Sequence, residues 1–322
     1  MKKRIQIIFL LLIIAIISLM YVGASSLEIQ TDNSNEIKAI GNTEIDKVKL
    51  DDIISYAQVN VGDDELNKIE FHFLDVGQGD STLVILPNGK TLLIDAGGSN
   101  YGNKVVNYIK SLKISKIDYL VMTHPHADHI GGMEKVIDNF DIGTIYMTDM
   151  ITTTKTFNDL LLNIERKNLK IITPKANDII SAGDDFKVLV LSPSRKYEGI
   201  NEMSLVIQMI YKNNSFLLMG DSGTIVENDI LNSNLDIKSD LIKIGHHGSS
   251  YSSSSRFIQS ISPQFAIISF GKNPYGHPSS KTLETLNKYR VKIYSTYEFG
   301  DIIVSSDGNS IKIDYNSWIR SW

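Results

Sequence analysis

The order of strand-like and helical segments constrains the fold of this chain more than any other feature. Residues 69–94 read as paired strands, with Asn88-Gly89 in a tight hairpin turn. Strands then alternate with helical segments, and the same order begins again near residue 186 with successive strands. Sheets packed face to face and covered outside by helices fit this order. The sequence therefore predicts an α/β protein, a four-layer αββα sandwich, over residues 68–316.

Segments with helical spacing supply the outer layers of this predicted sandwich. One of them covers residues 103–113, and its buried face is predicted to contain Val105, Val106, Ile109 and Leu112. Further helices are expected over residues 131–140, 156–168, 225–234, 254–261 and 280–289.

Residues 1–24 differ in character from the rest of the chain. A basic stretch over residues 2–4 precedes an uncharged, mostly aliphatic run over residues 5–24, which ends in small residues that fit a signal-peptidase site. As a helix this run would reach ~30 Å, the thickness of a bilayer core. We therefore predict either a cleaved signal peptide or a retained N-terminal anchor. Both place the remaining chain outside the cell or on its surface, with membrane contact only through this segment.

Residues 25–67 are polar and acidic and show no clear period. We predict a linker here, with a short helix near residues 51–56. The predicted αββα domain begins after this linker, where the strand pattern starts.

Composition limits the chemistry of any site in this chain. None of the 322 residues is cysteine, so a metal must be held by nitrogen and oxygen ligands. The formal net charge of −5 argues against broad electrostatic capture of nucleic acid. It still permits local phosphate binding in a metal-bearing cleft.

Four potential metal ligands follow one apolar run directly. The segment THPHADH contains His124, His126, Asp128 and His129 at the expected carboxyl end of a strand. Imidazole together with carboxylate suits zinc, manganese or iron, and four such ligands exceed the need of one open catalytic ion. A site for two divalent ions, zinc or manganese, divides them. His124 and His126 then bind one ion, and Asp128 and His129 bind the other.

Three other predicted strands are also followed by aspartate or histidine. Asp221 follows the strand of FLLMGD and is predicted to bridge the two ions, although the position also suits a helix N-cap. His246 and His247 follow the strand of LIKIG, and we predict that His246 binds metal while His247 acts in catalysis. The opposite assignment stays open. Asp95 ends the strand of LLID and is predicted to orient a metal-bound histidine.

Together these motifs resemble a known family. THPHADHIGG is similar to the signature of the metallo-β-lactamase superfamily, and LIDAGG, MGD and GHHGS resemble its other motifs in order. FLDVGQGDST, NEMSLVI, GHHGSSYSSS and YGHPS further resemble the metallo-hydrolase domain attached to the competence DNA-uptake channel, the ComEC-like branch. The resemblance extends over about residues 69–314 and implies an αββα fold, a dinuclear site and hydrolysis.

One position departs from the wider superfamily. Many members carry a further histidine before the bridging aspartate, yet no histidine lies between His129 and His246 here. The ComEC-like branch also lacks this histidine. The resemblance to that branch implies that Asn201 or Ser204 lies near the position that the histidine occupies in other members. The many apolar segments of the channel have no counterpart in this sequence, so we expect a free-standing exported or anchored hydrolase.

The expected mechanism uses a metal-bound hydroxide as nucleophile, oriented by Asp128. His277 is predicted to contact the substrate or to protonate the leaving group, unless it only fixes its loop. Asp75, Gln78 and Asp80 in LDVGQGDS are predicted to shape the site from the opposite rim. Asp80 has two possible roles, as a partner of a metal-ligating histidine or as a brace of the turn.

The predicted substrate is a phosphodiester, either DNA or a phosphodiester of the cell envelope. The absence of a Lys/Arg-rich stripe favours a small or envelope substrate, whereas the ComEC-like resemblance favours DNA. One alternative is hydrolysis of C–O or C–N bonds, as in lactones, esters and β-lactams. Another is a metal-binding ectodomain without turnover. The sequence indicates no protein partner.

Overall fold

The computed structural model describes residues 27–31, 37–41 and 68–315. The predicted signal peptide or anchor over residues 1–24 and the short helix near residues 51–56 lie outside these ranges. Within them, no helix combines the length and the apolar character needed to cross a bilayer.

The chain divides into two compact units, with the division between residues 66 and 67. In the first unit, β1 (Leu27–Thr31) and β2 (Ile37–Gly41) form an antiparallel pair. The sequence predicted only a linker here, because both strands have only five residues and the apolar–polar alternation of Leu27 to Gln30 is too short to stand out in a polar stretch. The second unit contains the predicted hydrolase domain, and all that follows concerns it.

One sheet of the second unit combines strands of the first half with the final hairpin. Its described strands are ordered β17-β16-β3-β4-β5-β6-β7-β8. Strands β5 to β8 run parallel, and the neighbouring pairs from β17 to β5 are antiparallel. The bounds are β3 (Ile69–Phe73), β4 (Thr82–Ile85), β5 (Thr91–Ile94), β6 (Lys116–Met122), β7 (Asp141–Met147), β8 (Ile171–Ile172), β16 (Ile302–Ser306) and β17 (Ile311–Tyr315).

The other sheet comes from the second half, with described strands in the order β15-β14-β13-β12-β11-β10-β9. Strands β12 to β15 run parallel, and β9 to β12 are antiparallel. The bounds are β9 (Ile179–Ala182), β10 (Phe186–Ser192), β11 (Val206–Tyr211), β12 (Asn214–Leu218), β13 (Leu241–Lys243), β14 (Phe265–Ile268) and β15 (Lys292–Ser295). Each sheet therefore has an antiparallel part and a parallel part, as the sequence order indicated.

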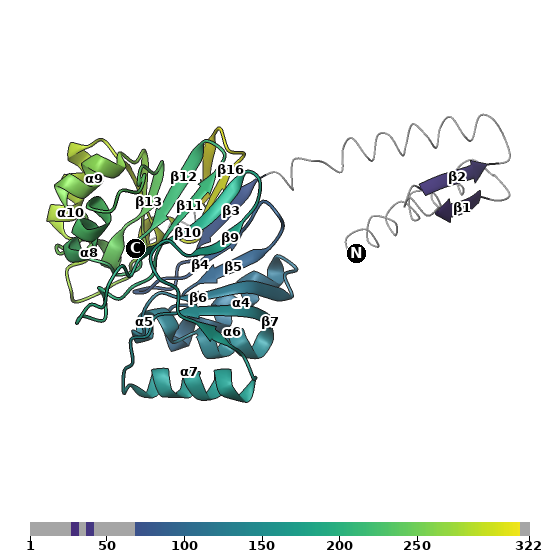
Figure 1. Ribbon diagram of the computed structural model, residues 1–322, viewed down its shortest axis with the longest axis horizontal. Coiled ribbons are helices and arrows are strands. Elements are labelled where there is room, and N and C mark those ends of the chain that lie inside the picture. Colours follow the sequence, from purple (N-terminus) through teal and green to yellow (C-terminus); the bar gives the residue numbers. More distant parts are fainter. Residues whose placement is uncertain (1–26, 32–36, 42–67, 316–322) are drawn as a thin grey trace. The chain divides into compact units, whose positions relative to one another are not determined.

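Helices cover the outer face of each sheet. Figure 1 shows α4, α6 and α7 on one side of this unit and α8, α9 and α10 on another, with the strands between them. The bounds are α4 (Gly102–Ser111), α5 (Ala127–Ile130), α6 (Met133–Asn139), α7 (Lys155–Arg166), α8 (Thr224–Leu231), α9 (Ser255–Ile261), α10 (Ser280–Lys288) and α11 (Thr296–Phe299). Two short 3-10 helices are η1 (Ser99–Tyr101) and η2 (Gly245–Gly248).

Three apolar clusters show that the layers are stacked as α, β, β and α. One cluster lies between the sheets and joins residues such as Phe71 to Phe216. A second joins the outer face of the first sheet to its helices, and a third does the same for the second sheet. On β5, Leu93 belongs to the outer cluster, whereas Leu92 and Ile94 belong to the inner one. Both faces of central strands such as β5 are buried, and the predicted αββα sandwich is confirmed.

Three local features differ from the expectation. Leu112 is partly exposed, because α4 ends at Ser111 and leaves Leu112 beyond its last turn. Asp128 and His129 lie in the short helix α5, whereas the sequence predicted a helix only from residue 131 onward. The edge strand β9 escaped notice because it has four residues and pairs only with β10.

A buried ion pair joins the two sheets. Lys243 ends β13, and its Nζ donates to Asp80 Oδ2 at 2.7 Å and to the carbonyl of Ile244 at 3.0 Å. Asp80 lies in the loop between β3 and β4, and its carbonyl accepts from Gly97 N at 2.8 Å. Both charged side chains are buried. Because a buried charge without a partner is costly, this pair fixes one sheet against the other.

We expect Lys243→Met to lower the free energy of unfolding by ~3–5 kcal/mol, because Asp80 would remain buried without its cation. The double variant Lys243→Met/Asp80→Leu should lose less than the single variant, since neither charge then remains. Urea unfolding of the three proteins measures both differences.

Lys238→Met is a matched control, because Lys238 is an exposed lysine just before the same strand. Its effect should stay within about 0.5 kcal/mol. A Lys243→Met protein as stable as this control would contradict the clamping role of the ion pair.

Candidate metal centre

The predicted ligands meet where parallel strands of both sheets end. Asp95 follows β5 and His124 follows β6 in the first sheet, while Asp221 follows β12 and His247 follows β13 in the second. Carboxyl ends of parallel strands lie along one edge of a sheet, so these four loops converge. They open into a pocket of about 770 Å³, which is lined by Gln78, His126, Ala127, Asp128, Asp221, His246, His247, Ser249, Tyr251, Lys272, Asn273, Pro274, Tyr275 and His277.

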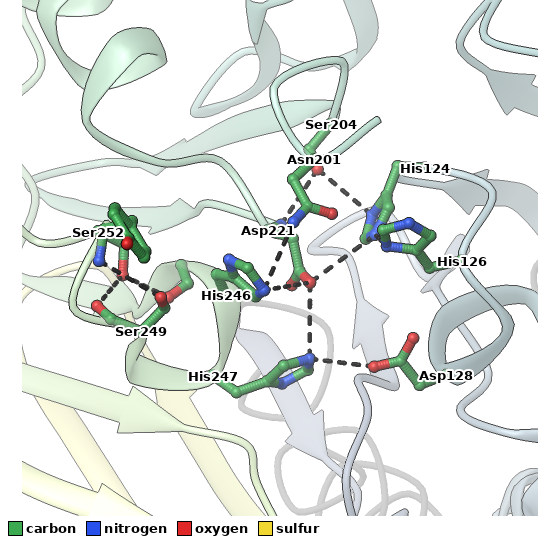
Figure 2. Close-up of polar contacts among 12 residues, drawn as sticks. His124, His126, Asp128, Asn201, Ser204, Asp221, His246, His247, Ser249 and Ser252 are labelled. Atoms are coloured by element: carbon green, nitrogen blue, oxygen red, sulfur yellow. Dashed lines mark hydrogen bonds and ion pairs between the residues drawn. The ribbon is translucent and has the colours of Figure 1, made fainter. Parts of the chain in front are cut away.

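One group of potential ligands consists of His124, His126 and Asp221. His124 Nε2 lies 3.0 Å from His126 Nδ1 and 3.7 Å from Asp221 Oδ2. Figure 2 shows the two imidazoles on one side of the Asp221 carboxylate. His124 and Asp221 are buried, whereas His126 reaches the pocket.

The second group consists of Asp128, His129 and His247. His247 Nε2 lies 3.3 Å from Asp128 Oδ2, and His129 Nε2 lies 3.9 Å from the same oxygen. Asp221 faces this group as well, with Oδ1 at 3.3 Å from His129 Nε2 and Oδ2 at 3.6 Å from His247 Nε2. The carboxylate of Asp221 thus stands between both groups, as its predicted bridging role requires.

The geometry favours His247 over His246 as the metal ligand, which is the assignment that the sequence placed second. His246 and His247 both have left-handed backbones, with φ of 49° and 53°. These consecutive turns direct His247 toward Asp128, while Figure 2 shows His246 beside Asn201. The side chain of His246 is 28% exposed and that of His247 is 2% exposed. Adjacency to the strand suggested His246, but the backbone turn decides which imidazole faces inward.

Carbonyl and carboxylate acceptors fix the tautomers of two histidines. His247 Nδ1 donates to the Ser269 carbonyl at 2.9 Å, and His129 Nδ1 donates to Asp95 Oδ2 at 2.8 Å. Because each Nδ1 carries the proton, each Nε2 is left to face the centre. Asp95 therefore makes the contact with a histidine that the sequence predicted for it.

Hydroxyl groups complete the surroundings of His124. Thr123 Oγ1 donates to Asp95 Oδ2 at 2.6 Å and lies 3.1 Å from His124 Nδ1. Ser204 Oγ lies 3.3 Å from the same nitrogen and accepts from Asp221 N at 3.1 Å. Ser204 and Asn201 thus lie beside the ligand groups, near the position where the sequence lacks a histidine.

The loop between β3 and β4 approaches from the other side. Gly79 has a φ of 150°, and a Cβ there would lie 2.3 Å from the carbonyl oxygen of Asp128, so the close approach requires glycine. Asp80 Oδ1 lies 3.6 Å from His247 Nδ1, and Gln78 lines the pocket.

Asp75, in the same loop, has a different position. Its Oδ1 accepts a hydrogen bond from Gly77 N at 3.1 Å, and its own backbone N–H donates to Asp301 Oδ1. Asp75 thus supports the loop and is not among the pocket-lining residues.

His277 lies at the pocket, with its ring centroid 5.2 Å from that of His246 and 6.3 Å from that of His247. Its backbone N–H donates to Asn273 Oδ1 at 3.1 Å, which holds the loop. The position is compatible with either predicted role, substrate contact or loop support.

The electrostatics of the centre depend on Asp221. Burial would raise its pKa, but His129 and His247 hold that pKa well below its ordinary value. Burial would lower the pKa of His129, yet the carboxylates of Asp221 and Asp95 hold it well above the usual range. His124 behaves oppositely, because burial and the neighbouring His129 lower its pKa well below the ordinary value. Asp221 is therefore ionised within a shell of imidazoles.

Several buried atoms of the centre lack hydrogen-bond partners. They include His129 Nε2, His247 Nε2 and Asp221 Oδ1. Buried polar atoms are normally hydrogen-bonded, so convergent atoms without hydrogen bonds indicate that they bind something else. Two ligands on one tetrahedral zinc, with bonds of ~2.0–2.2 Å, stand roughly 3.4 Å apart, which is close to the spacings above. The donor set of nitrogen and oxygen fits zinc or manganese.

Two contributors were missed from the sequence. Lys243 was read only as part of an apolar strand, although a lysine within DLIKIG was a signal for a buried counter-ion. Thr123 begins the THPHADH motif, and its hydroxyl contacts both Asp95 and His124. A threonine after a strand is common, so no signal in the sequence indicated this role.

Comparisons with known proteins agree with this geometry. The chain matches the family model of the Metallo-beta-lactamase superfamily over residues 74–272. It is 31% identical over 252 residues to ComE operon protein 3 of Bacillus subtilis (strain 168), covering 72% of this chain and 32% of that protein. It is also 29% identical over 251 residues to Recombination protein 2 of Haemophilus influenzae, covering 72% and 28% respectively.

A third relative is Competence protein ComA of Neisseria gonorrhoeae, with 28% identity over 225 residues, 69% of this chain and 30% of that protein. The chain thus spans about a third of the length of these curated relatives. The family model covers more than half of the chain, and its range contains both ligand groups. The resemblance seen in the sequence motifs is confirmed, and the chain belongs to the metallo-β-lactamase superfamily.

Proposed function

We propose that this chain is a metal-dependent hydrolase of phosphodiesters. The observation that carries the proposal is the convergence of buried nitrogen and oxygen atoms without hydrogen bonds at the floor of an open pocket. A purely structural metal site is normally closed by its ligands, whereas a catalytic one keeps an open position. This difference favours turnover over a metal-binding ectodomain without activity.

Two divalent ions, zinc or manganese, would be held by the two ligand groups. His124 and His126 would bind one ion, Asp128, His129 and His247 the other, and Asp221 would be shared. Ions bound there would supply Lewis-acid polarisation and lower the pKa of water. The protein fixes the donor atoms through Asp95, Ser204 and the Ser269 carbonyl.

Three of the residues that line the pocket beside the ligand groups are placed to act on the substrate. His246 is partly exposed, and its Nε2 lies 3.4 Å from Asn201 Nδ2 and 3.9 Å from Asp221 Oδ2. We assign to it the catalytic role that the sequence assigned to His247, and we specify that role as proton donation, because its imidazole faces the opening. Gln78 and His277 line the same opening and would orient the substrate.

A phosphodiester suits this arrangement better than a lactam. It presents two non-bridging oxygens, one for each ligand group, whereas a lactam carbonyl presents one. The first group has only His124, His126 and the shared Asp221, which leaves room for a substrate oxygen. Relatives named for competence and recombination further support a phosphodiester substrate.

We further propose that the protein is exported and acts outside the cell or at its surface. Support comes only from residues 1–24, which combine a basic start with a long uncharged apolar run.

The metal assignments predict the ion content of purified variants. Protein reconstituted with manganese or zinc should hold about two ions per chain. Asp221→Asn should lose most of both ions, because each ligand group loses the shared carboxylate. His247→Ala should lose about one ion. Inductively coupled plasma mass spectrometry after gel filtration measures the content.

His246→Ala is the matched control, because it removes the neighbouring imidazole and should leave the metal content unchanged. Circular dichroism excludes unfolding as the cause of metal loss. If His246→Ala loses an ion while His247→Ala retains both, the two assignments must be exchanged.

The substrate proposal predicts that manganese- or zinc-loaded protein hydrolyses bis(p-nitrophenyl) phosphate and leaves nitrocefin intact. His246→Ala should reduce kcat on the phosphodiester by ~10²–10⁴, the usual effect of removing a positioned acid or base. Steady-state absorbance assays at equal metal content measure both substrates. Efficient nitrocefin cleavage without any phosphodiester turnover would refute the assignment of substrate class.

Export predicts that the full-length chain is recovered from the membrane or the medium after cell fractionation. N-terminal sequencing then separates the two possibilities, since a start near Ser25 indicates cleavage and an intact Met1 indicates an anchor. Recovery only from the cytosolic fraction would contradict export.

A further inference from the structure

Two exposed tyrosines stand at the pocket that contains the ligand groups. Tyr251 is 77% exposed and Tyr275 is 70% exposed, and both line this pocket. Among the described residues with large exposed apolar side chains, the other aromatic one is Tyr315, at 43%. The two most exposed aromatic rings of residues 68–315 therefore share one site.

The backbones that carry these rings are held in place. Tyr251 N donates to Ser249 Oγ at 3.3 Å, and its carbonyl accepts from Thr224 N at 2.8 Å. Tyr275 N donates to Asn273 Oδ1 at 3.0 Å, and Asn273 Nδ2 donates to the Gly271 carbonyl at 2.8 Å. Ordered loops thus present both rings to solvent, although burying such a ring would be favourable.

Aromatic rings extend from this rim toward the ligand groups. The ring centroid of Tyr275 lies 5.8 Å from that of His277, with an angle of 37° between the planes. The centroid of His277 lies 5.2 Å from that of His246, beside the floor of the pocket. A planar group bound next to Tyr275 would therefore lie beside further aromatic rings, those of His277 and His246, which extend from the rim to the ligand groups.

The charge at the rim suits an anion. Lys272 is exposed and lines the same pocket as Tyr275. The carboxylates that line the pocket, Asp128 and Asp221, belong to the ligand groups on the floor. A phosphate next to a planar group would meet a cation at the rim without a competing carboxylate there.

We propose that Tyr251 and Tyr275 are specificity residues that stack on a base of the substrate, so that the preferred phosphodiester joins nucleosides rather than polyols. This inference rests on the proposed function and adds the class of substrate. Stacking on tyrosine accepts any base, because every base has a π face, so little sequence preference is expected.

The bound segment is short and single-stranded. Bases in a duplex are already stacked on each other and cannot reach two separate rings. One rim lysine and a net charge of −5 provide no long track for a polyanion. A dinucleotide or the unpaired end of a strand satisfies both limits.

The test compares two phosphodiesters on the manganese-loaded full chain: a thymidine dinucleotide and a diester of two glycerols, which has no ring. Three variants are compared with the natural chain: Tyr251→Leu/Tyr275→Leu, Tyr251→Phe/Tyr275→Phe, and Tyr315→Leu as a tyrosine control. Binding of a non-hydrolysable dinucleotide phosphonate, in which CH2 replaces the bridging oxygen of the scissile bond and both non-bridging oxygens are kept, is measured separately by calorimetry, with circular dichroism to confirm folding.

We expect the natural chain to prefer the dinucleotide. The double leucine variant should lose ~10–100-fold in kcat/KM on the dinucleotide, mainly through KM, and bind the analogue correspondingly more weakly. The double phenylalanine variant should retain both, because the ring face and not the hydroxyl makes the contact. Tyr315→Leu should behave like the natural chain.

The outcomes separate the base site from the hydrolase activity. Turnover of the glycerol diester with no preference for the dinucleotide overturns the base site and leaves the hydrolase proposal standing. The base site is also overturned if the double leucine variant binds the analogue as well as the natural chain does. Failure of fully loaded protein to cleave either diester overturns the proposed function, while analogue binding that depends on the tyrosines would still support the base site.

Discussion

The pairing of Lys243 with Asp80 is the interaction on which the arrangement of the centre depends. It joins β13 of one sheet to the β3–β4 loop of the other, inside the protein. The ligand groups need this alignment, because His129 comes from the first sheet and Asp221 from the second, with 3.3 Å between Nε2 and Oδ1. A shift of either sheet would separate these atoms. No backbone ladder joins the two sheets within residues 68–315, so individual contacts hold them in register: this ion pair, and single bonds such as Leu205 N to the Thr123 carbonyl at 3.0 Å.

Part of the backbone strain in the described residues lies at the same edge. Asp95, His246 and His247 all have positive φ values, which cost of order 1–3 kcal/mol each for residues other than glycine. Local bonds hold these conformations, among them Asp95 N to the Val121 carbonyl at 2.9 Å and His246 N to the Gly220 carbonyl at 3.1 Å. The positive φ values turn these three side chains in directions that the regular backbone of a strand would not allow. Their position at the pocket fits a site whose geometry has been selected for binding.

The pocket changes in character from floor to rim. Its floor consists of an ionised carboxylate enclosed by imidazoles, where burial strengthens every charge interaction. Its rim carries exposed tyrosine rings and a lysine on hydrogen-bonded loops. In our proposal the floor supplies the chemistry that is common to phosphodiesters, and the rim selects among them. The two functions can therefore be altered separately by mutation.

Local patterns in the sequence determined the order of strands and helices, and the residues that follow strands identified His124, His126, Asp128, His129 and Asp221 as neighbours. Such patterns are readable because strand and helix periods reflect short-range geometry. The tertiary structure alone decided that His247 faces the centre, that Lys243 pairs with Asp80, 163 positions away, and that Tyr251 and Tyr275 share a pocket. These facts depend on backbone turns and on contacts between distant segments, which no local period encodes.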